Sequence, residues 1–262
     1  MPRLGAAEPV RGPRGPLALS LLALFALIAF AGFVALGTWQ VQRLAWKREL
    51  IERVEQRVHA PAVDAPAPAE WPAVTATSHE YRHVRLAGHF LYEQQVLVTA
   101  STALGSGYWV MTPLRRTDGS IVLVNRGFVP AEACGRDGRC APGPAGEVVL
   151  TGLLRTPETK VFLRHNDPAH ARWYARDVQA IAAARGLGAV APFFVDADAD
   201  PAHADAWPRG GLTVTSFPNN HLSYLITWYV LALMVLAASA YVGRHEYRLR
   251  RRRERQGSPR AG

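Results

Sequence analysis

The sequence predicts a membrane protein in which two transmembrane α-helices flank a mainly antiparallel β (α+β) domain on the outer side of the membrane. The first observation is a pair of uncharged apolar segments, residues 17–36 and 222–242. Each would be about 30 Å long as a helix, which is enough to cross the hydrocarbon core, and a backbone in lipid must be helical. Between them, short β-type segments alternate with turns rich in Gly and Pro, a pattern typical of antiparallel folds.

Composition and charge exclude several other classes of protein. The net charge is +9, but the tail 243–262 holds eight Arg against two Glu, and the tail 1–16 holds three Arg against one Glu. Each basic tail adjoins an apolar segment, whereas a nucleic-acid-binding domain would carry its charge on a folded face. Two cysteines are too few for a disulfide-dense scaffold or a four-cysteine zinc site. No nucleophile-elbow, Walker A or dinucleotide-binding motif is present, so the sequence indicates no enzyme class.

The distribution of basic residues predicts the orientation. The tail 243–262 is the most basic segment next to a membrane end, so we expect both tails to be cytoplasmic and the domain 37–221 to be external. It would be periplasmic in a bacterial inner (plasma) membrane, or lie in the intermembrane space of a mitochondrion. Basic residues between 43 and 57 oppose this orientation, but long domains translocate largely regardless of charge.

The first apolar segment has an alternative interpretation as a cleavable signal peptide, because a basic stretch precedes it and Ala29-Phe30-Ala31 imitates a cleavage site. The apolar residues continue to Leu36 and meet Trp39, a residue type common at membrane interfaces. This continuation favours an uncleaved anchor.

The external domain is expected to begin with a helical extension over 37–58, which has good helix formers and neither Gly nor Pro after Gly37. Residues 60–72 are rich in Pro and Ala and predict an extended linker. Asp118-Gly119 predicts a hairpin turn, and a short helix over 175–186 should end at Gly186. The expected strands are 81–90, 94–100, 107–116, 120–130, 146–155, 192–198 and 211–218. Together they predict a barrel or a sandwich.

Two patterns in the domain could carry chemistry. The segment His79–His83 matches the zinc-protease pattern H-E-x-x-H. In a strand the two His would lie about 13 Å apart, which favours a chance match; a membrane-anchored metalloenzyme using His79 and His83 is the remote alternative. Cys134 and Cys140 flank a Gly-containing loop and predict a local disulfide in an oxidising compartment. Free thiols or a Cu(I) pair are the alternatives.

The start of the second apolar segment is the least ordinary part of the sequence. Tyr224 and Trp228 follow His221 at i+3 and i+7, so the three share one helical face. Aromatic residues at this depth are usual in an interfacial belt. An ionisable residue at a membrane edge is a functional candidate, and imidazole is a common ligand of haem iron.

The first segment carries Trp39, Arg43 and Trp46 at a similar depth. An aromatic-walled slot with one His and one Arg suits a flat, lipophilic, anionic ligand. Iron would bind His221, and Arg43 would pair with a propionate. An ordinary aromatic belt beside a solvated charged face is the alternative for these residues as well.

Six segments across almost the whole chain resemble one known family, the Surfeit locus protein 1 family of cytochrome c oxidase assembly factors, and indicate a bacterial-type member. They keep the order and spacing of that family within a frame of two membrane spans. The segments are LGTWQVQRLAWK (36–47), VRLAGHF (84–90), GYWVMTPL (107–114), VNRGFVP (124–130), NDPAHARWYARDV (166–178) and GGLTVTSFPNNHLSYLITWY (210–229). Two positions depart from the family pattern, because Asn125 stands where Asp is expected and Leu225 where Ala is expected.

The resemblance implies a non-enzymatic inner-membrane protein that helps to mature cytochrome c oxidase. Its implied partners are subunit I of the oxidase, haem a synthase and the lipid bilayer, and its implied cofactor is transiently bound haem a. The family's proposed haem ligand corresponds to His221, and a further family residue to Trp228. Gly37 and Gly127 are implied to be structural. A scaffold that holds subunit I without binding haem is the alternative function.

Overall fold

The computed structural model describes residues 14–134, 143–159, 161, 163–216 and 219–257. The chain divides into two compact units, one formed by residues 1–49 and 218–262 and the other by residues 50–217. We call the first the helical unit and the second the β domain.

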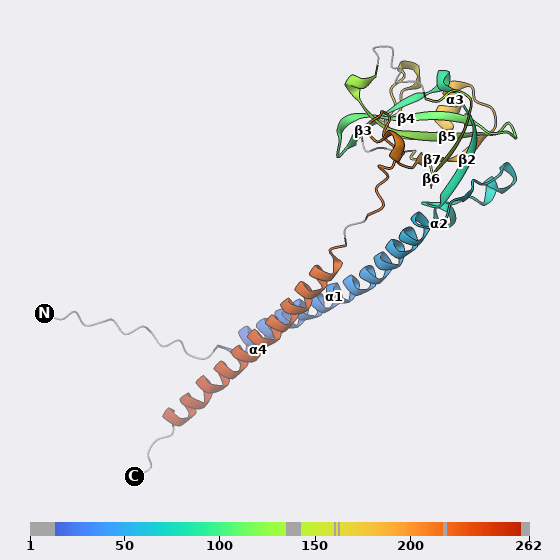
Figure 1. The fold of residues 1–262 in the computed structure, drawn as a ribbon. Coiled ribbons are helices and arrows are strands. Elements are labelled where there is room, and N and C mark those ends of the chain that lie inside the picture. The colour runs from blue at the N-terminus through green and yellow to red at the C-terminus, as the bar shows by residue number, and fades with distance from the viewer. Residues whose placement is uncertain (1–13, 135–142, 160, 162, 217–218, 258–262) are drawn as a thin grey trace, which may run out of the picture. The chain divides into compact units, whose positions relative to one another are not determined.

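The helical unit contains α4 (His221–Gly257) and most of α1 (Pro16–Val58), whose last residues, 50–58, belong to the β domain (Figure 1). Both are long and apolar enough to cross a membrane by length and composition. α1 continues without a break from its apolar segment into its charged segment, because no Gly or Pro follows Gly37 before it ends. The two predicted helices at the ends of the chain are therefore confirmed.

α1 and α4 pack along a seam of less exposed side chains. These residues follow one another at intervals of three and four, the spacing of left-handed helix packing. They are Phe33, Gly37, Gln40 and Leu44 of α1 and His221, Leu225, Trp228 and Ala232 of α4. The rings of Phe33 and Trp228 stack with their centroids 5.8 Å apart. A Cβ atom on Gly37 would lie 3.0 Å from the Tyr229 ring, so this glycine allows a close approach of the two helices.

The β domain is built on one seven-stranded sheet in the order β1-β2-β6-β7-β5-β4-β3. The strands are β1 (Val63–Asp64), β2 (His83–Phe90), β3 (Val96–Thr102), β4 (Gly105–Arg115), β5 (Ile121–Pro130), β6 (Glu147–Arg155) and β7 (Val190–Ala197). Only the β1–β2 and β5–β7 pairs are parallel in the described chain. β2 also pairs with β4 through His89–Arg115 and Phe90–Leu114, so the ring β2–β6–β7–β5–β4 closes into a barrel. The predicted antiparallel β domain is confirmed.

Short helices connect the strands. They are η1 (Pro68–Ala73), α2 (Ala76–His79), η2 (Tyr92–Gln94), η3 (Ala131–Ala133), η4 (Pro168–His170), α3 (Val178–Arg185) and η5 (Pro201–His203). α3 is the predicted short helix. The Asp177 side chain caps its start by accepting from the Ala180 N–H at 3.0 Å, and Gly186 ends it in the left-handed conformation (φ 61°). The predicted hairpin joins β4 and β5, with Gly119 at φ 81°.

The core has two layers that share β5. One cluster lies on the interior face of the barrel and includes Val84, Leu86, Leu114, Val122, Val124, Leu154, Phe193 and Val195. The other lies between the sheet and α3 and includes Val96, Met111, Leu123, Val178, Ile181 and Phe194. Successive residues of a strand point to opposite faces, so β5 contributes Val122 and Val124 to one layer and Leu123 to the other. This explains why its sequence is an almost continuous apolar run.

Two segments differ from their predicted form. The predicted linker 60–72 contains β1 and part of η1, and its Trp71 packs against the barrel core, because an apolar side chain gains from burial whatever its local composition. Residues 211–216 of the predicted last strand form no strand. β7, the strand before them in the chain, already pairs with β6 on one side and β5 on the other, so β7 has no free edge at which they could pair.

Candidate functional site

His221, the predicted haem ligand, is the first residue of α4. Its Nδ1 lies 2.8 Å from Oε1 of Gln40 on α1. An amide oxygen only accepts hydrogen bonds, so Nδ1 carries the proton and Nε2 carries the lone pair. Nε2 has no hydrogen-bond partner among the residues that the structure describes. Gln40 itself is buried, with 7% of its surface exposed.

The other residues of the predicted slot take two positions. Trp228 lies in the seam against Phe33, and its Nε1 is buried without a hydrogen-bond partner in the described part of the chain. Trp39 and Tyr224 are 53% and 55% exposed. The exposed Arg43 stacks on Trp46, with its guanidinium carbon 4.0 Å from the ring centroid. The structure thus brings His221 and Trp228 onto one seam and leaves Trp39, Arg43 and Tyr224 on outward surfaces of the two helices.

The donor set at His221 fits a haem iron. A neutral imidazole with a free Nε2 lone pair would be able to bind the iron, and a hydrogen bond from the opposite nitrogen is the usual support for a histidine that binds a metal. The guanidinium of Arg43 has no carboxylate partner among the described residues, so it is available to a propionate. Gln40 is the residue of this site that the sequence analysis missed. The sequence pattern that could have indicated it is a polar residue three positions after Gly37 and four before Leu44, the spacing of one helical face.

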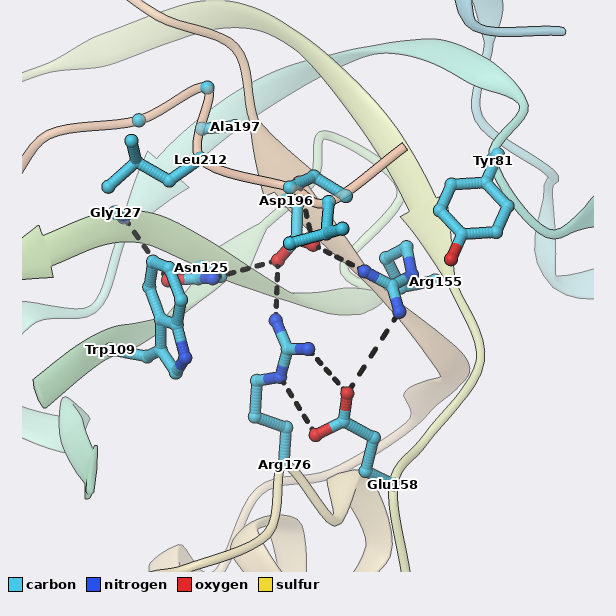
Figure 2. Close-up of a pocket in the computed structure, with 14 residues that line it drawn as sticks. Tyr81, Trp109, Asn125, Gly127, Arg155, Glu158, Arg176, Asp196, Ala197 and Leu212 are labelled. Atoms are coloured by element: carbon cyan, nitrogen blue, oxygen red, sulfur yellow. Dashed lines mark hydrogen bonds and ion pairs between the residues drawn. The ribbon is translucent and has the colours of Figure 1, made fainter. Parts of the chain in front are cut away.

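A second site lies in the β domain, where a cavity of about 300 Å³ opens beside the ends of β5, β6 and β7 (Figure 2). Asp196 of β7 lies at its centre, with its side chain 5% exposed. Its Oδ1 accepts hydrogen bonds from Asn125 at 2.8 Å and Arg176 at 3.0 Å. Its Oδ2 accepts from Arg155 at 3.0 Å and from the Thr213 hydroxyl at 2.9 Å. This buried carboxylate therefore joins three strands and the segment 211–216.

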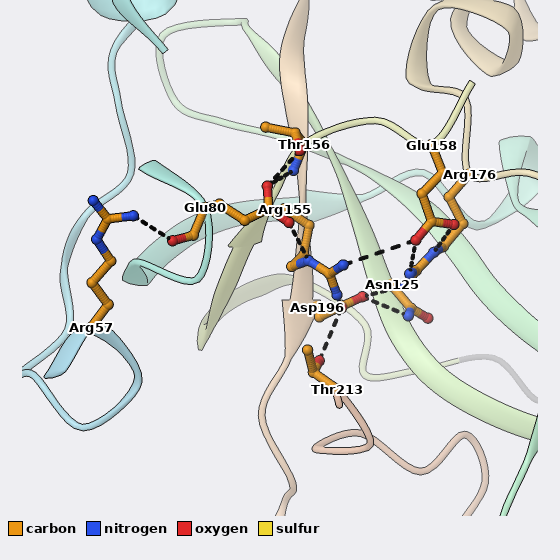
Figure 3. Close-up of polar contacts among 9 residues, drawn as sticks. All are labelled: Arg57, Glu80, Asn125, Arg155, Thr156, Glu158, Arg176, Asp196 and Thr213. Carbon is orange, nitrogen blue, oxygen red and sulfur yellow. Dashed lines mark hydrogen bonds and ion pairs between the residues drawn. The ribbon is translucent and has the colours of Figure 1, made fainter. Parts of the chain in front are cut away.

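The two arginines around Asp196 are neutralised by further acids (Figure 3). Arg155 donates to Glu80 at 2.8 Å, and Arg176 donates through Nε to Glu158 at 3.1 Å. Burial by itself would lower the pKa of Arg155, but the charge of Asp196 and the hydrogen bond to Glu80 outweigh it and raise that pKa above its ordinary value. Since each charge has an opposite partner, we interpret this ion-pair network as a structural feature that stabilises the barrel end.

His79 and His83 do not form a shared site. His79 Nδ1 lies 2.7 Å from the Ser78 hydroxyl. Both nitrogens of His83 are engaged, Nδ1 with the Ala60 carbonyl at 3.0 Å and Nε2 with Asp198 at 2.7 Å. Among the described residues, no group of three or more His, Cys, Asp or Glu side chains could hold a metal ion. The geometry gives no support to the metalloenzyme alternative.

The contacts of His83 predict a pH dependence of the domain's stability. Burial lowers the pKa of His83, but the hydrogen bonds to Asp198 and Ala60 outweigh it and raise the pKa above its ordinary value. The protonated ring therefore stabilises the fold below about pH 6.5, and this contribution is lost as pH rises through the folded-state pKa. We expect the free energy of unfolding to fall by less than about 1 kcal/mol between pH 6 and pH 8, since the pair is partly exposed. Urea unfolding should show this fall in the native chain and not in His83→Gln; an equal fall in both would contradict it.

The predicted Cys134–Cys140 disulfide stays a prediction, because Cys140 lies outside the described residues.

Comparison with known proteins decides the family. The chain matches the SURF1 family model over residues 27–233. The chain belongs to the SURF1 family. It is 36% identical to Surfeit locus protein 1 of Rattus norvegicus over 225 residues, which cover 79% of this chain and 69% of that protein. The identity to Surfeit locus protein 1 of Homo sapiens is 36% over 228 residues, covering 79% and 71% of the two chains. A SURF1-like protein of Monosiga brevicollis is 34% identical over 223 residues, covering 80% and 82%.

The region of this SURF1-family protein that matches the family model contains both sites. It includes Gln40, Asp196 and His221, and it ends inside α4, before the basic residues 244–255. Both sites therefore lie in the part of the chain that is similar to the family, whereas the basic end of α4 lies outside that part.

Proposed function

We propose that this SURF1-family protein is an assembly factor for cytochrome c oxidase, which binds haem a through His221 and helps its insertion into subunit I. The proposal is supported by family membership and, above all, by one observation: the histidine at the start of α4 has its Nδ1 hydrogen-bonded and its Nε2 free. Haem a would supply an iron that accepts one imidazole nitrogen. A carrier of this kind needs no catalytic dyad, so we propose no enzymatic activity.

Different residues of the chain would contact different parts of the haem. His221 would hold the iron, and Arg43 would pair with a propionate from its outward position beside Trp46. Trp39 and Tyr224, both more than half exposed, offer aromatic surface to a flat ligand. Transfer of the haem to subunit I requires that the bond between His221 and the iron be exchangeable, so we expect a moderate affinity for haem.

We propose a bacterial inner-membrane location with both termini in the cytoplasm and the β domain in the periplasm. The basic end of α4 supports this, since Arg244, Arg248, Arg250–Arg253 and Arg255 are all exposed. The buried Glu246 is paired with Arg14 at 3.1 Å, so it does not offset their charge. Clusters of Arg next to a membrane span favour the cytoplasmic side. Subunit I, haem a synthase and the bilayer are the proposed partners.

An absorption spectrum tests the proposed haem site. The full chain would be purified in detergent after co-expression with the enzymes of haem a synthesis, beside His221→Ala. We expect a Soret band near one haem per chain in the native protein and its loss in the variant. His245→Ala is the matched control, because His245 also lies on α4 but stacks on Tyr241, and it should keep the band.

Two results would contradict the proposed site. Equal bands in all three proteins would move the iron ligand to another residue. The absence of a band in every protein would favour the haem-independent scaffold for subunit I.

A further inference from the structure

Gln40 is a buried amide in an otherwise largely apolar helix seam. It is 7% exposed, and its seam neighbours on α1 are Gly37 and Leu44. Burying an amide without a hydrogen-bond partner is unfavourable, because the amide loses its hydrogen bonds to water. A leucine in the same position would pack without this cost. The presence of an amide at this buried position is explained by the hydrogen bond that its Oε1 accepts from His221 Nδ1, at 2.8 Å.

We propose that Gln40 is a positioning residue that holds His221 in the tautomer with the proton on Nδ1 and presents Nε2 as the iron ligand. This inference rests on the proposed haem binding. The two ring nitrogens of a histidine compete for one proton, and the hydrogen bond made by one nitrogen decides which of them is free for a metal. Gln40 Oε1 accepts from Nδ1, so it selects Nε2.

The main chain of His221 is also held by a hydrogen bond. The His221 N–H donates to the Asn219 side-chain oxygen at 3.4 Å, so the start of α4 is fixed on one side while Gln40 fixes the ring from the other helix. His221 and Gln40 are 181 positions apart in the sequence. The ligand geometry consequently exists only when α1 and α4 are paired, which makes the pairing of the helices a condition for haem binding.

The tautomer can be measured without haem. The full chain, labelled with ¹⁵N-histidine and held in detergent micelles at a pH where the ring is neutral, would be examined by NMR. The signals of His221 would be assigned by their loss in His221→Ala. We expect the Nδ1–H tautomer in the native chain and a mixture in Gln40→Leu. Gln42→Leu is the matched control, because Gln42 lies on the same helix but is exposed, and it should leave the tautomer unchanged. An Nε2–H tautomer in the native chain would overturn the inference.

The haem-loaded protein provides a second readout. Loss of a residue that supports a metal ligand typically weakens binding by about 10–100-fold, so we expect haem binding in Gln40→Leu to weaken to that extent. Gln40→Glu keeps an acceptor and adds a negative charge, which makes the imidazole a stronger donor. It should retain haem and lower the midpoint potential. Gln42→Leu should match the native chain in both properties. Circular dichroism and gel filtration would establish that each variant is folded. If Gln40→Leu does not fold, the test relies on Gln40→Glu.

The outcomes separate the inference from the proposed function. If His221→Ala loses haem while every Gln40 variant keeps the native affinity and potential, the positioning role is overturned and the haem site stands. If His221→Ala retains haem, the ligand assignment fails and the role of Gln40 fails with it. A purely structural role for Gln40 would leave the tautomer of His221 unchanged in Gln40→Leu.

Discussion

Replacing Asp196 with alanine is expected to lower the free energy of unfolding of the β domain by about 3–5 kcal/mol. That is the usual cost of removing one partner of a buried ion pair, because the remaining charges stay buried without compensation. Asp196 is 4% exposed and accepts four hydrogen bonds, two of them from Arg155 and Arg176. Glu80 and Glu158 would still neutralise part of the charge on these arginines, but the side-chain hydrogen bonds that Asp196 accepts from Arg155 of β6 and from Thr213 would be lost.

Urea unfolding of the full chain in detergent, followed by tryptophan fluorescence, would measure the change. Asp205→Ala is the control, because Asp205 is fully exposed and lies 3.5 Å from Arg209; its effect should stay within about 0.5 kcal/mol. Hydrogen exchange would locate the effect of Asp196→Ala, with faster exchange expected in peptides from β6 and β7. If Asp196→Ala lowers the free energy of unfolding no more than Asp205→Ala does, the ion-pair network around Asp196 does not stabilise the barrel end.

Gly127→Ala is expected to destabilise the same domain by about 2–6 kcal/mol. Two costs add together. Gly127 has φ 130°, a conformation in which an alanine is strained by about 1–3 kcal/mol. A Cβ atom would also lie 2.1 Å from the Arg209 carbonyl oxygen, and relieving such an overlap costs about 1–3 kcal/mol. Moving Arg209 would break its paired backbone hydrogen bonds with Phe128, which are 2.8 and 2.9 Å long.

Gly105→Ala separates the two costs. Gly105 also has a positive φ, 108°, but a Cβ atom there would meet nothing within 4 Å. It therefore reports the backbone strain alone, and we expect Gly127→Ala to cost about 1–3 kcal/mol more. Thermal unfolding monitored by circular dichroism would compare the two variants with the native chain. Equal losses would mean that the segment around Arg209 moves aside freely, which would contradict a structural role for Gly127.

Much of the architecture could be predicted from local patterns. The apolar segments 17–36 and 222–242 predicted helices because hydrocarbon leaves the backbone no other partner than itself. The hairpin at Asp118-Gly119 and the end of α3 at Gly186 could be placed because each depends on conformations that few residues adopt. Two other expectations depended on long-range strand pairing. Residues 211–216 of the predicted last strand form no strand, and the predicted linker 60–72 contains β1, which pairs with β2. Local composition does not show whether a distant strand is available for pairing.

The residues of the candidate site could likewise be predicted only in part from the sequence. The helical period placed His221 and Trp228 on one face of α4, and the structure puts both in the seam. The period on α1 could not decide which face meets α4. Trp39 and Arg43 were as good candidates as Gln40 by helical phase. The structure buries Gln40, one turn after Gly37, which lies against the Tyr229 ring.

The two membrane-type helices, the β character of the domain between them and the family could all be predicted from the sequence, because each depends on periods and motifs along the chain. The closure of the barrel, the burial of Asp196 among its four donors and the pairing of Gln40 with His221 became visible only in the folded chain. These features join residues that are far apart in the chain, and their free energy comes from contacts that exist only after folding.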